Sequence, residues 1–301
     1  MIKQINFLFY GINYLIKTKI LKKKIPFNGA IIINDLCNLN CKHCNVSSKK
    51  GNNIPYEQIK KDMEKLYLKG IRFLEITGGE PFLYKYNEKN IEDIIKLAKQ
   101  IGFYKILLCT NGTIPINTLA DYVWVSLDGN KKTHNSIRGN TFDKILNNIK
   151  KSKHKKIFIN FTISQLNYKD FGIYVKDILF RKKIKGILFH FFIPYINSSN
   201  IEIYEELKNN IIKEIFILKK KYGKKICNTK SALNYLKNGN WQKPVWGSLI
   251  IYNGKISSCC CRSEIVNSNI CNCCLSTPAV ETYNVQNINF RSLLEILRNF
   301  S

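Results

Sequence analysis

The sequence has few acidic residues and no long apolar run. Asp and Glu together number 21 against 48 Lys and Arg, so the 301-residue chain carries a formal net charge of +27. No apolar stretch reaches the roughly 20 residues that a membrane-spanning helix needs. The opening segment also lacks the small-residue cleavage site of a secretory signal peptide. These absences predict a cytoplasmic protein without a transmembrane helix.

The positive charge has no local focus along the sequence. Lysines are spread over the chain, without a dense basic stripe and without the interleaved aromatic residues that stack on bases. Lys, Asn and Ile are frequent throughout, as expected from an A/T-biased coding sequence. We therefore attribute the charge to compositional bias rather than to a nucleic-acid partner, and a solvated basic surface is a further alternative.

Eleven cysteines are many for a reducing compartment, where disulfides are rare and clustered cysteines indicate metal centres. Cys37, Cys41 and Cys44 follow an apolar run at 30–33 with the spacing C-x3-C-x2-C. A cubane iron–sulfur cluster normally takes four thiolates, so three local thiols leave one iron open to a small molecule. A structural zinc site, with His43 or a distant cysteine as fourth ligand, is the alternative. Zinc sites usually show paired C-x2-C or C-x2-H units, which fit this spacing poorly.

From residue 27 the hydrophobic pattern alternates between strands and helices. It predicts six strands, over 30–33, 71–76, 105–109, 122–127, 157–163 and 186–192, with amphipathic helices between most of them. Such units form a parallel sheet with right-handed crossovers and helices outside. The pattern does not distinguish an open sheet from a barrel.

Distinctive polar residues follow these predicted strands. The sequence Gly78-Gly79-Glu80-Pro81 follows the second strand, and Thr110-Asn111-Gly112 follows the third. Ser126 and Asp128 end the fourth strand. In parallel α/β folds, functional groups lie at the carboxyl ends of strands. The glycines allow a close backbone approach, and Glu80 offers a carboxylate to an ammonium group.

The cysteine spacing and the GGEP sequence together resemble the radical S-adenosylmethionine (SAM) superfamily over roughly residues 27–195. The resemblance implies a partial (β/α)6 barrel in which Cys37, Cys41 and Cys44 hold a [4Fe-4S] cluster whose open iron chelates SAM. It also implies reductive cleavage of SAM to methionine and a 5′-deoxyadenosyl radical. The electron would come from a flavodoxin- or ferredoxin-type protein.

The same resemblance assigns SAM contacts. Gly78, Gly79 and Glu80 are expected at the methionine amino group, and Ser126 and Asp128 at the ribose hydroxyls. The segment 131–139 is expected to be a loop that resembles the H-x3-R-G stretch of many members; it contains His134 and Arg138.

Residues of the same loop and of neighbouring predicted strands are also candidates for contact with SAM or the substrate. Arg138 is expected to pair with the SAM carboxylate, the alternatives being a helix-capping Asp128 and a solvent-exposed arginine. His43 stands where the family usually has an aromatic residue near adenine. Asn160, Thr162 and His190 either face the substrate or simply line the barrel. Cys109 and Cys227 are isolated, and Cys109 is expected to be a packed thiol.

Beyond residue 195 the alternation fades. The pattern predicts a helical linker over 196–244, with one helix from Asn200 to Gly223 and a shorter one from Thr229 to Gly239. In the extension 245–301, Asn253-Gly254 predicts a hairpin, and a last helix is expected at 290–297. Six cysteines lie between 259 and 274, and this region resembles the start of SPASM/twitch extensions. We therefore expect an auxiliary iron–sulfur cluster, or alternatively a zinc site; the expected ligands are Cys259, Cys271, Cys273 and Cys274.

Residues 1–26 are predicted to form a basic amphipathic helix, which either closes the core domain or contacts an anionic membrane surface. With a cysteine-rich tail, the resemblance favours modification of a peptide or protein. The start of the chain also resembles the lead-in of adenosylhopane-synthase-type enzymes, so a lipid or isoprenoid substrate is an alternative. A non-catalytic iron–sulfur electron-transfer module is the alternative from another class, but it leaves the GGEP sequence unexplained.

Overall fold

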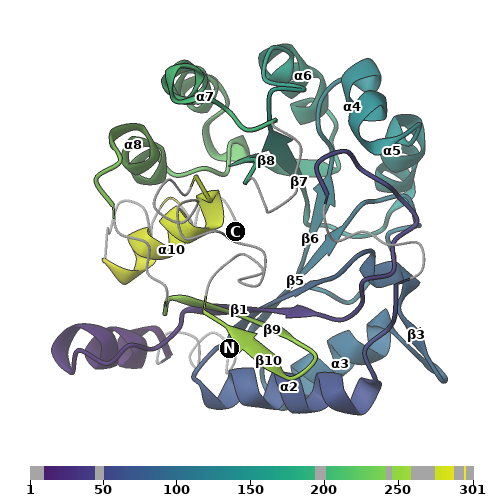
Figure 1. Cartoon of the computed structure of the whole chain (residues 1–301), viewed down its shortest axis with the longest axis vertical. Coiled ribbons are helices and arrows are strands. Elements are labelled where there is room, and N and C mark those ends of the chain that lie inside the picture. The colour runs from purple at the N-terminus through teal and green to yellow at the C-terminus, as the bar shows by residue number, and fades with distance from the viewer. Residues whose placement is uncertain are drawn as a thin grey trace.

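The computed structural model describes residues 10–44, 51–193, 201–241, 246–258, 275–287 and 295. Their main feature is an eight-stranded sheet in the order β10-β9-β1-β2-β5-β6-β7-β8. The sheet curves strongly, with most helices on its convex face (Figure 1). The predicted fold class, α/β with a sheet of six parallel strands and helices outside, is confirmed in this arrangement.

Six consecutive strands of this sheet are parallel and correspond to the six predicted ones. They are β1 (Asn28–Ile32), β2 (Phe73–Thr77), β5 (Lys105–Thr110), β6 (Tyr122–Ser126), β7 (Ile157–Ile163) and β8 (Ile184–Phe191). Their carboxyl ends therefore meet at one edge of the sheet, as the placement of the polar motifs requires. A short hairpin of β3 (Lys85–Tyr86) and β4 (Lys89–Asn90) follows β2 and the 3-10 turn η2 (Pro81–Leu83).

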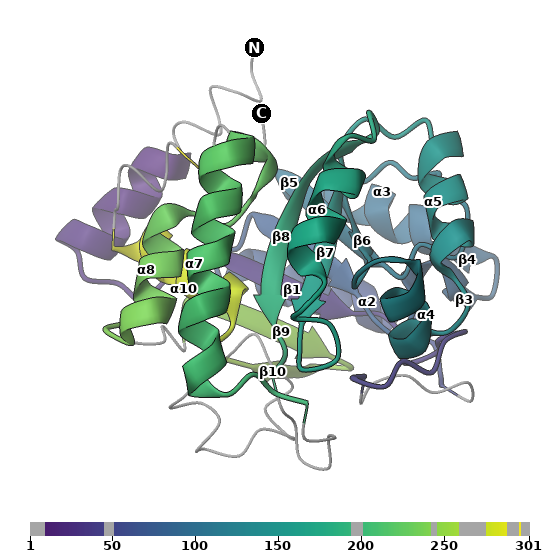
Figure 2. The same ribbon diagram turned by 90° about the horizontal axis from the view of Figure 1, so that it is seen from above.

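The helices that follow the strands begin and end at recognisable signals. They are α2 (Tyr56–Leu68), α3 (Ile91–Ile101), α4 (Lys131–Arg138), α5 (Phe142–Lys151) and α6 (Phe171–Leu179). A capping box of Asn90 and Asp93 starts α3, and left-handed Gly102 ends it. Figure 2 shows α6 lying against β7 and β8.

The expected loop at 131–139 is wrong, because these residues form α4. The side chain of Asn130 accepts a hydrogen bond from the backbone N–H of Thr133, and Gly139 follows the last helical residue with a positive φ of 83°. Both are ordinary helix signals that the pattern of charged residues concealed.

Alternating side chains of the strands pack against the helices. Phe161, Phe189 and Phe171 are fully buried in one cluster between β7, β8 and α6. A second cluster, which includes Ile76 and Met63, fills the space between β1, β2, α2 and α3. Each such buried side chain contributes about 1.5–3 kcal/mol to folding, so the layer between sheet and helices fixes the strand ends that carry the motifs.

The described C-terminal elements complete the sheet. They are α7 (Glu205–Tyr222), the turn η3 (Gly223–Lys225), α8 (Lys230–Asn238), β9 (Ser248–Tyr252), β10 (Lys255–Ser257) and α10 (Thr277–Gln286). The predicted hairpin is confirmed, with positive φ at Asn253 (45°) and Gly254 (82°). β9 pairs in parallel with β1, so the hairpin extends the main sheet.

Helix α10, which the sequence analysis missed, packs against α8 and β8 and lies between α8 and strands β1 and β9 in Figure 1. The hydroxyl of Thr277 donates to the carbonyl of Phe189 at 2.9 Å, and Val280 is fully buried. Ser276 caps the helix and Pro278 occupies its first turn, two signals that were visible in the sequence. The helix predicted at 290–297 lies outside the described residues apart from Glu295.

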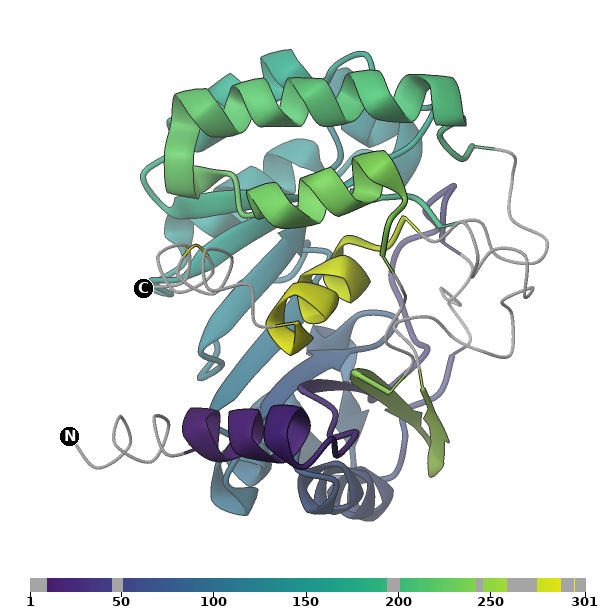
Figure 3. The same cartoon turned by 90° about the vertical axis from the view of Figure 1, so that its left-hand side faces the viewer.

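The N-terminal helix packs where the parallel strands begin. Residues 10–15 are helical and continue as the π-helical turn η1 (Ile16–Ile20). The hydroxyl of Tyr10 donates to the carbonyl of Gly70 at 3.2 Å, and its ring packs against Phe73 and Tyr104. Figure 3 shows this helix lying across one end of the sheet.

A buried carboxylate joins α10 to α8. The backbone N–H and the hydroxyl of Thr229, the residue that caps α8, each donate to Glu281 at 2.8 Å. Burial raises the pKa of Glu281 to about 7, although the hydrogen bonds from Thr229 and Asn284 oppose the shift; the nearby Glu295 adds to it. The folded chain therefore keeps a proton on Glu281 that the unfolded chain has lost above about pH 4.5.

This proton makes stability depend on pH. Between about pH 4.5 and about pH 7 the folded state binds more protons at Glu281 than the unfolded state, so its contribution to stability falls as pH rises. Glu281→Gln, which resembles the protonated form, is expected to have a melting temperature that changes less over this range than that of the wild type. Thermal unfolding at both ends of the range measures this, and an unchanged pH slope would contradict it.

Candidate functional site

The loop after β1, which contains the three cysteines, is bonded directly to the loop after β2. The backbone N–H of Gly79 donates to the carbonyl of Asn34 at 2.9 Å, and that of Glu80 donates to the carbonyl of Leu36 at 2.8 Å. The side-chain amide of Asn34 donates back to the carbonyl of Glu80 at 3.1 Å. These three bonds join the cysteine loop to the GGEP loop at the carboxyl edge of the sheet.

Glycine is required at both positions of the GGEP loop by this contact. A Cβ atom on Gly79 would lie 2.3 Å from the carbonyl oxygen of Leu36, and one on Gly78 would lie 2.1 Å from Oδ1 of Asn34. Both distances are far below van der Waals contact. The predicted close approach of the glycine backbone is therefore to the cysteine loop itself.

The three thiols come from this one loop. Cys37 and Cys41 are buried, whereas Cys44 is exposed. The side-chain amide of Asn111 lies 3.8 Å from Sγ of Cys37, and Nη1 of Arg138 lies 3.9 Å from Sγ of Cys41. The backbone N–H of Leu39 also donates to Sγ of Cys37 at 3.4 Å. N–H groups thus surround two of the sulfurs, which suits thiolates that bind a metal centre.

Three thiols on one loop are the protein ligands that a cubane cluster with one open iron needs. Among the described residues, no three His, Cys, Asp or Glu side chains converge as ligands of one metal ion. The thiolate ligands of a cubane cluster do not converge on one atom, because each thiolate binds a different iron at its own corner of the cluster. Burial raises the pKa of the Cys41 thiol to about 11 and also raises that of Cys37, and binding of metal removes such protons.

Glu80 is completely buried and links the GGEP loop to the end of β5. Its Oε1 accepts from the backbone N–H of Phe82 at 3.1 Å and from the hydroxyl of Thr110 at 2.8 Å. Its Oε2 accepts from the backbone N–H of Asn111 at 2.7 Å. Burial raises its pKa to about 6, and these hydrogen bonds oppose the shift. A carboxylate has about four acceptor positions, so one remains on Oε2.

Asp128 and Arg138 form a buried ion pair that the sequence analysis did not predict. Nε of Arg138 donates to Oδ2 of Asp128, and the backbone N–H of Thr162 donates to Oδ1 at 2.8 Å. Burial is the largest single influence and would raise the pKa of Asp128, but the charge of Arg138, the nearby His43 and the hydrogen bonds from Thr162 and Arg138 together outweigh it and lower the pKa. Arg138 is not a solvent-exposed residue, and it connects Asp128 to the cysteine loop.

Two histidines lie beside this pair. Nε2 of His43 lies 3.8 Å from Oδ2 of Asp128, and burial lowers the pKa of His43 to about 4, so its imidazole is neutral at physiological pH. Nδ1 of His134 accepts from the backbone N–H of Asp128 at 3.2 Å. Its Nε2 then donates to the hydroxyl of Thr141 at 3.0 Å. His134 therefore positions Asp128 from α4.

Other predicted residues lie on the concave face of the sheet. Ser126 is paired in register with Asn160, and Thr162 with His190. These four are half-buried, and they alternate with side chains of the core cluster on the convex side. Oδ1 of Asn160 and Nδ1 of His190 are buried without a hydrogen-bond partner. The amide oxygen is an acceptor, and the ring nitrogen donates or accepts according to the tautomer, so a bound molecule would satisfy both.

The cysteine loop also has a support that sequence reasoning missed. The hydroxyl of Tyr252 on β9 donates to the carboxylate of Asp35 at 2.9 Å, across 217 residues of sequence. No local pattern signals such a pair. Cys109 lies apart from the loop, and its thiol donates to Glu75 at 3.4 Å. The predicted auxiliary ligands Cys259, Cys271, Cys273 and Cys274 lie outside the described residues.

The buried ion pair should be sensitive to loss of one partner. Asp128→Asn leaves the Arg138 guanidinium buried without a counter-charge, which is expected to cost about 3–5 kcal/mol of unfolding free energy. Denaturant unfolding of the variant measures the loss.

The exposed pair Lys131–Asp143, with Nζ and Oδ2 2.6 Å apart, gives a matched control. Asp143→Asn should cost less than about 1 kcal/mol, because solvent screens both charges. Equal losses in the two variants would show that burial of the Asp128–Arg138 pair does not matter.

Comparisons with known proteins identify the family of the segment that contains this site. The model of the Radical SAM superfamily matches residues 31–171, just under half of the chain. The Fe-coproporphyrin III synthase of Methanosarcina barkeri is 28% identical over 186 residues, covering 57% of this chain and 45% of the synthase. The antilisterial bacteriocin subtilosin biosynthesis protein AlbA of Bacillus subtilis is 29% identical over 154 residues, covering 46% of this chain and 33% of AlbA. The chain thus spans less than half the length of either relative.

A solved structure shares the fold. Streptococcus suis SuiB bound to precursor peptide SuiA superposes with a TM-score of 0.61 at 16% identity, covering 82% of this chain and 62% of SuiB. The family match extends from β1 to the first residue of α6 and includes the cysteine, GGEP and Asp128–Arg138 segments. Members of the family are enzymes that use a [4Fe-4S] cluster and SAM. Residues 31–171 of the chain therefore form a radical SAM domain.

Proposed function

We propose that this radical SAM enzyme modifies a peptide, and that its cluster is held by Cys37, Cys41 and Cys44. The observation that carries the proposal is the bonded pair of loops, which holds three thiols and the GGEP backbone together at the carboxyl edge of the sheet. Three thiolates leave a cubane one ligand short, so a fourth iron is open to SAM.

The protein groups around the sulfurs have a defined task. Asn111 and Arg138 direct N–H groups toward Cys37 and Cys41, and such donors, together with burial, set the reduction potential of a cluster. When bound, the cluster and SAM supply the reductive cleavage that gives methionine and a 5′-deoxyadenosyl radical. The electron comes from a small redox protein of the flavodoxin or ferredoxin type.

Three groups are proposed to hold SAM. Glu80 uses its remaining acceptor position on Oε2 for the methionine ammonium, a charge-assisted hydrogen bond in a buried site. Neutral His43 stacks on the adenine. Asp128 already accepts from Arg138 and Thr162, so any contact with ribose uses its remaining lone pairs.

Arg138 acts mainly as a positioning residue, because its Nε is committed to Asp128. Its role in the site is to keep that carboxylate ionised and to hold an N–H near Cys41. Ser126 is proposed to contribute a hydroxyl from the adjacent strand end.

The concave face offers a suitable surface for a peptide. Oδ1 of Asn160 and Nδ1 of His190 lie unsatisfied on adjacent strands, and a peptide backbone offers N–H donors and carbonyl acceptors of the matching kinds. Burial lowers the pKa of His190 to about 4, so at neutral pH its imidazole is uncharged, with one nitrogen that donates and one that accepts. The subtilosin biosynthesis protein and the peptide-bound SuiB structure support the same substrate class.

A tetrapyrrole is the second candidate, because the synthase of Fe-coproporphyrin III aligns over more of this chain than the subtilosin protein does. A propionate-bearing ring would need cationic partners. Among the described residues on the concave strand ends, Arg138 is already paired with Asp128, which favours the peptide.

Substrate-dependent release of 5′-deoxyadenosine tests the peptide proposal. The reconstituted enzyme, with SAM and dithionite under argon, is incubated with a library of short synthetic peptides, with free amino acids of the same composition, or with coproporphyrin III. We expect at least one peptide, and neither of the other two additions, to raise nucleoside release by about tenfold or more and to change in mass. Stimulation by the porphyrin and not by any peptide would contradict the proposal.

A further inference from the structure

The outer face of the N-terminal helix is an aliphatic stripe. Ile12, Ile16 and Ile20 recur at every fourth residue and therefore share one face. Their exposed fractions are 47%, 42% and 72%, and that of the adjacent Leu21 is 54%. Isolated exposed aliphatic residues are ordinary, but four on one helical segment form a patch that a soluble surface rarely carries without a partner.

The opposite face of the same helix packs against the core of the domain. Tyr14 is buried, and its ring packs edge-on against Phe27. Its hydroxyl donates to the carbonyl of Ile25 at 3.2 Å. The prediction that this helix closes the core domain and the prediction that it contacts a surface are therefore compatible, because they concern opposite faces.

Positive charge surrounds the stripe. Lys22, Lys23 and Lys24 follow Leu21 directly and are exposed. The chain therefore places a basic segment next to the aliphatic residues, the combination that binds lipid headgroups and the first part of the acyl chains.

The N-terminal helix packs at the end of the barrel where the parallel strands begin. Further positive charge at this end comes from the connections that lead into those strands. Four segments join a helix to the start of a parallel strand, at 69–72, 102–104, 152–156 and 180–183. They contain no acidic residue and eight basic ones, namely Lys69, Arg72, Lys153, Lys155, Lys156, Arg181, Lys182 and Lys183. We expected the basic residues to be spread over the surface without forming a patch. That expectation is wrong at this end, because parallel strands place segments that are distant in sequence next to one another.

The opposite end of the barrel has a different balance. The described segments 33–44, 78–90, 127–130 and 164–170 follow strands. They contain five acidic residues, Asp35, Glu80, Glu88, Asp128 and Asp170, and four basic ones, Lys42, Lys85, Lys89 and Lys169. Compositional bias would enrich both ends equally, so the asymmetry is a property of this surface.

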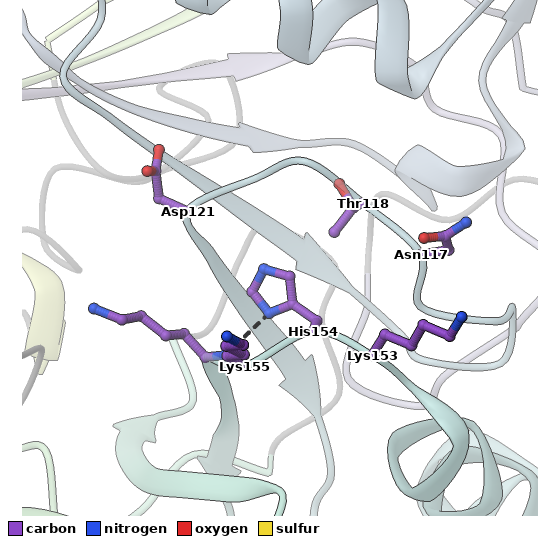
Figure 4. Close-up of a pocket in the computed structure, with 7 residues that line it drawn as sticks. Asn117, Thr118, Asp121, Lys153, His154 and Lys155 are labelled. Carbon is purple, nitrogen blue, oxygen red and sulfur yellow. Dashed lines mark hydrogen bonds between the residues drawn. The ribbon is translucent and has the colours of Figure 1, made fainter.

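A pocket of about 380 Å³ lies within the basic end, between the starts of β6 and β7 (Figure 4). Lys153, Lys155 and Lys156 line it together with His154, whose ring is fixed by the backbone N–H of Lys156 and the carbonyl of Ala120. Its one acidic residue, Asp121, accepts from the backbone of Ile106. A pocket of this kind suits a phosphate group at the surface of a bilayer.

We propose that the barrel end at which the strands begin docks on an anionic membrane surface. The aliphatic stripe enters the headgroup region, and the surrounding lysines face lipid phosphates. No helix in the described part of the chain has the length and apolar content to cross a bilayer. Docking in this orientation leaves the cysteine loop, at the other end of the strands, facing the aqueous side.

Lipid explains the surface better than nucleic acid does. Single-stranded nucleic acid is held by aromatic side chains on which bases stack, combined with basic groups. Four of the exposed apolar residues here, Ile12, Ile16, Ile20 and Leu21, are aliphatic side chains that insert into acyl chains but offer no stacking face. Phe180, 70% exposed, is the single aromatic residue beside them in the described connections that is exposed to this degree, whereas a strand of bases needs several. Charge and apolar surface are adjacent, as a bilayer interface requires.

Vesicle flotation with the full-length, cluster-reconstituted protein tests the proposal. We expect the protein to float with phosphatidylcholine vesicles that contain phosphatidylglycerol and not with phosphatidylcholine alone. Binding should weaken as salt is raised. Ile20→Gln is expected to weaken partitioning about tenfold, because one aliphatic side chain no longer leaves water.

The chain supplies matched controls. Ile173 on α6 is 77% exposed, close to the 72% of Ile20, but lies at the opposite end of the strands. Ile173→Gln should leave partitioning unchanged. Likewise Lys153→Glu with Lys155→Glu should weaken binding, whereas Lys85→Glu with Lys89→Glu, the same change in charge at the other end, should not.

Specific outcomes would overturn the docking proposal. One is failure to float with the anionic vesicles, and another is an equal effect of Ile20→Gln and Ile173→Gln. If DNA binds instead, with dependence on Lys153 and Lys155 but none on Ile20, the surface serves nucleic acid. Melting temperatures of all variants identify any loss due to unfolding, and the radical chemistry is measured separately by nucleoside release.

Discussion

The structure of the site depends on the hydrogen bonds that join the cysteine loop to the GGEP loop. Gly79 and Glu80 donate backbone N–H groups to Asn34 and Leu36, and Asn34 returns one to Glu80. Because the Glu80 carboxylate also accepts from Thr110 and Asn111, the ends of β1, β2 and β5 form one bonded unit. The geometry exists only if residues 78 and 79 lack a Cβ atom. The two glycines thus determine the position of the cysteine loop and its thiols, and they do so whether or not their backbone also contacts SAM.

The molecule separates two kinds of surface along its strand direction. The carboxyl ends carry the thiols, buried carboxylates and unsatisfied acceptors, which are groups that a cofactor or substrate would complete. The opposite end carries the lysine-rich connections and the aliphatic stripe of the N-terminal helix. Parallel topology produces this separation, since each strand start and each strand end must share an edge. A substrate can therefore approach the cysteine loop while the other end is engaged.

The sequence predicted those structural features that depend on local sequence patterns. Apolar runs located all six core strands, and turn signals located the Asn253-Gly254 hairpin. It could not predict contacts that depend on tertiary packing, such as the Asp128–Arg138 pair, the N–H of Asn111 at Cys37, or the distant Tyr252–Asp35 bond. Helices α4 and α10 were missed although their caps were visible. α4 contains one aliphatic residue, Ile137, in eight, and α10 shows no clear amphipathic repeat. The basic surface at the strand starts was missed because its connections are far apart in the sequence and become neighbours only in the folded chain.

The central claim is that Cys37, Cys41 and Cys44 are the protein ligands of the cluster at which SAM is cleaved. The most direct measurement replaces each by alanine, with Cys109→Ala as control, and follows iron content, the brown absorbance and 5′-deoxyadenosine release after anaerobic reconstitution. The account predicts that each of the three variants loses the SAM-cleaving activity and most of the absorbance, while Cys109→Ala keeps both. Full retention of absorbance and nucleoside release in any of the three would contradict it.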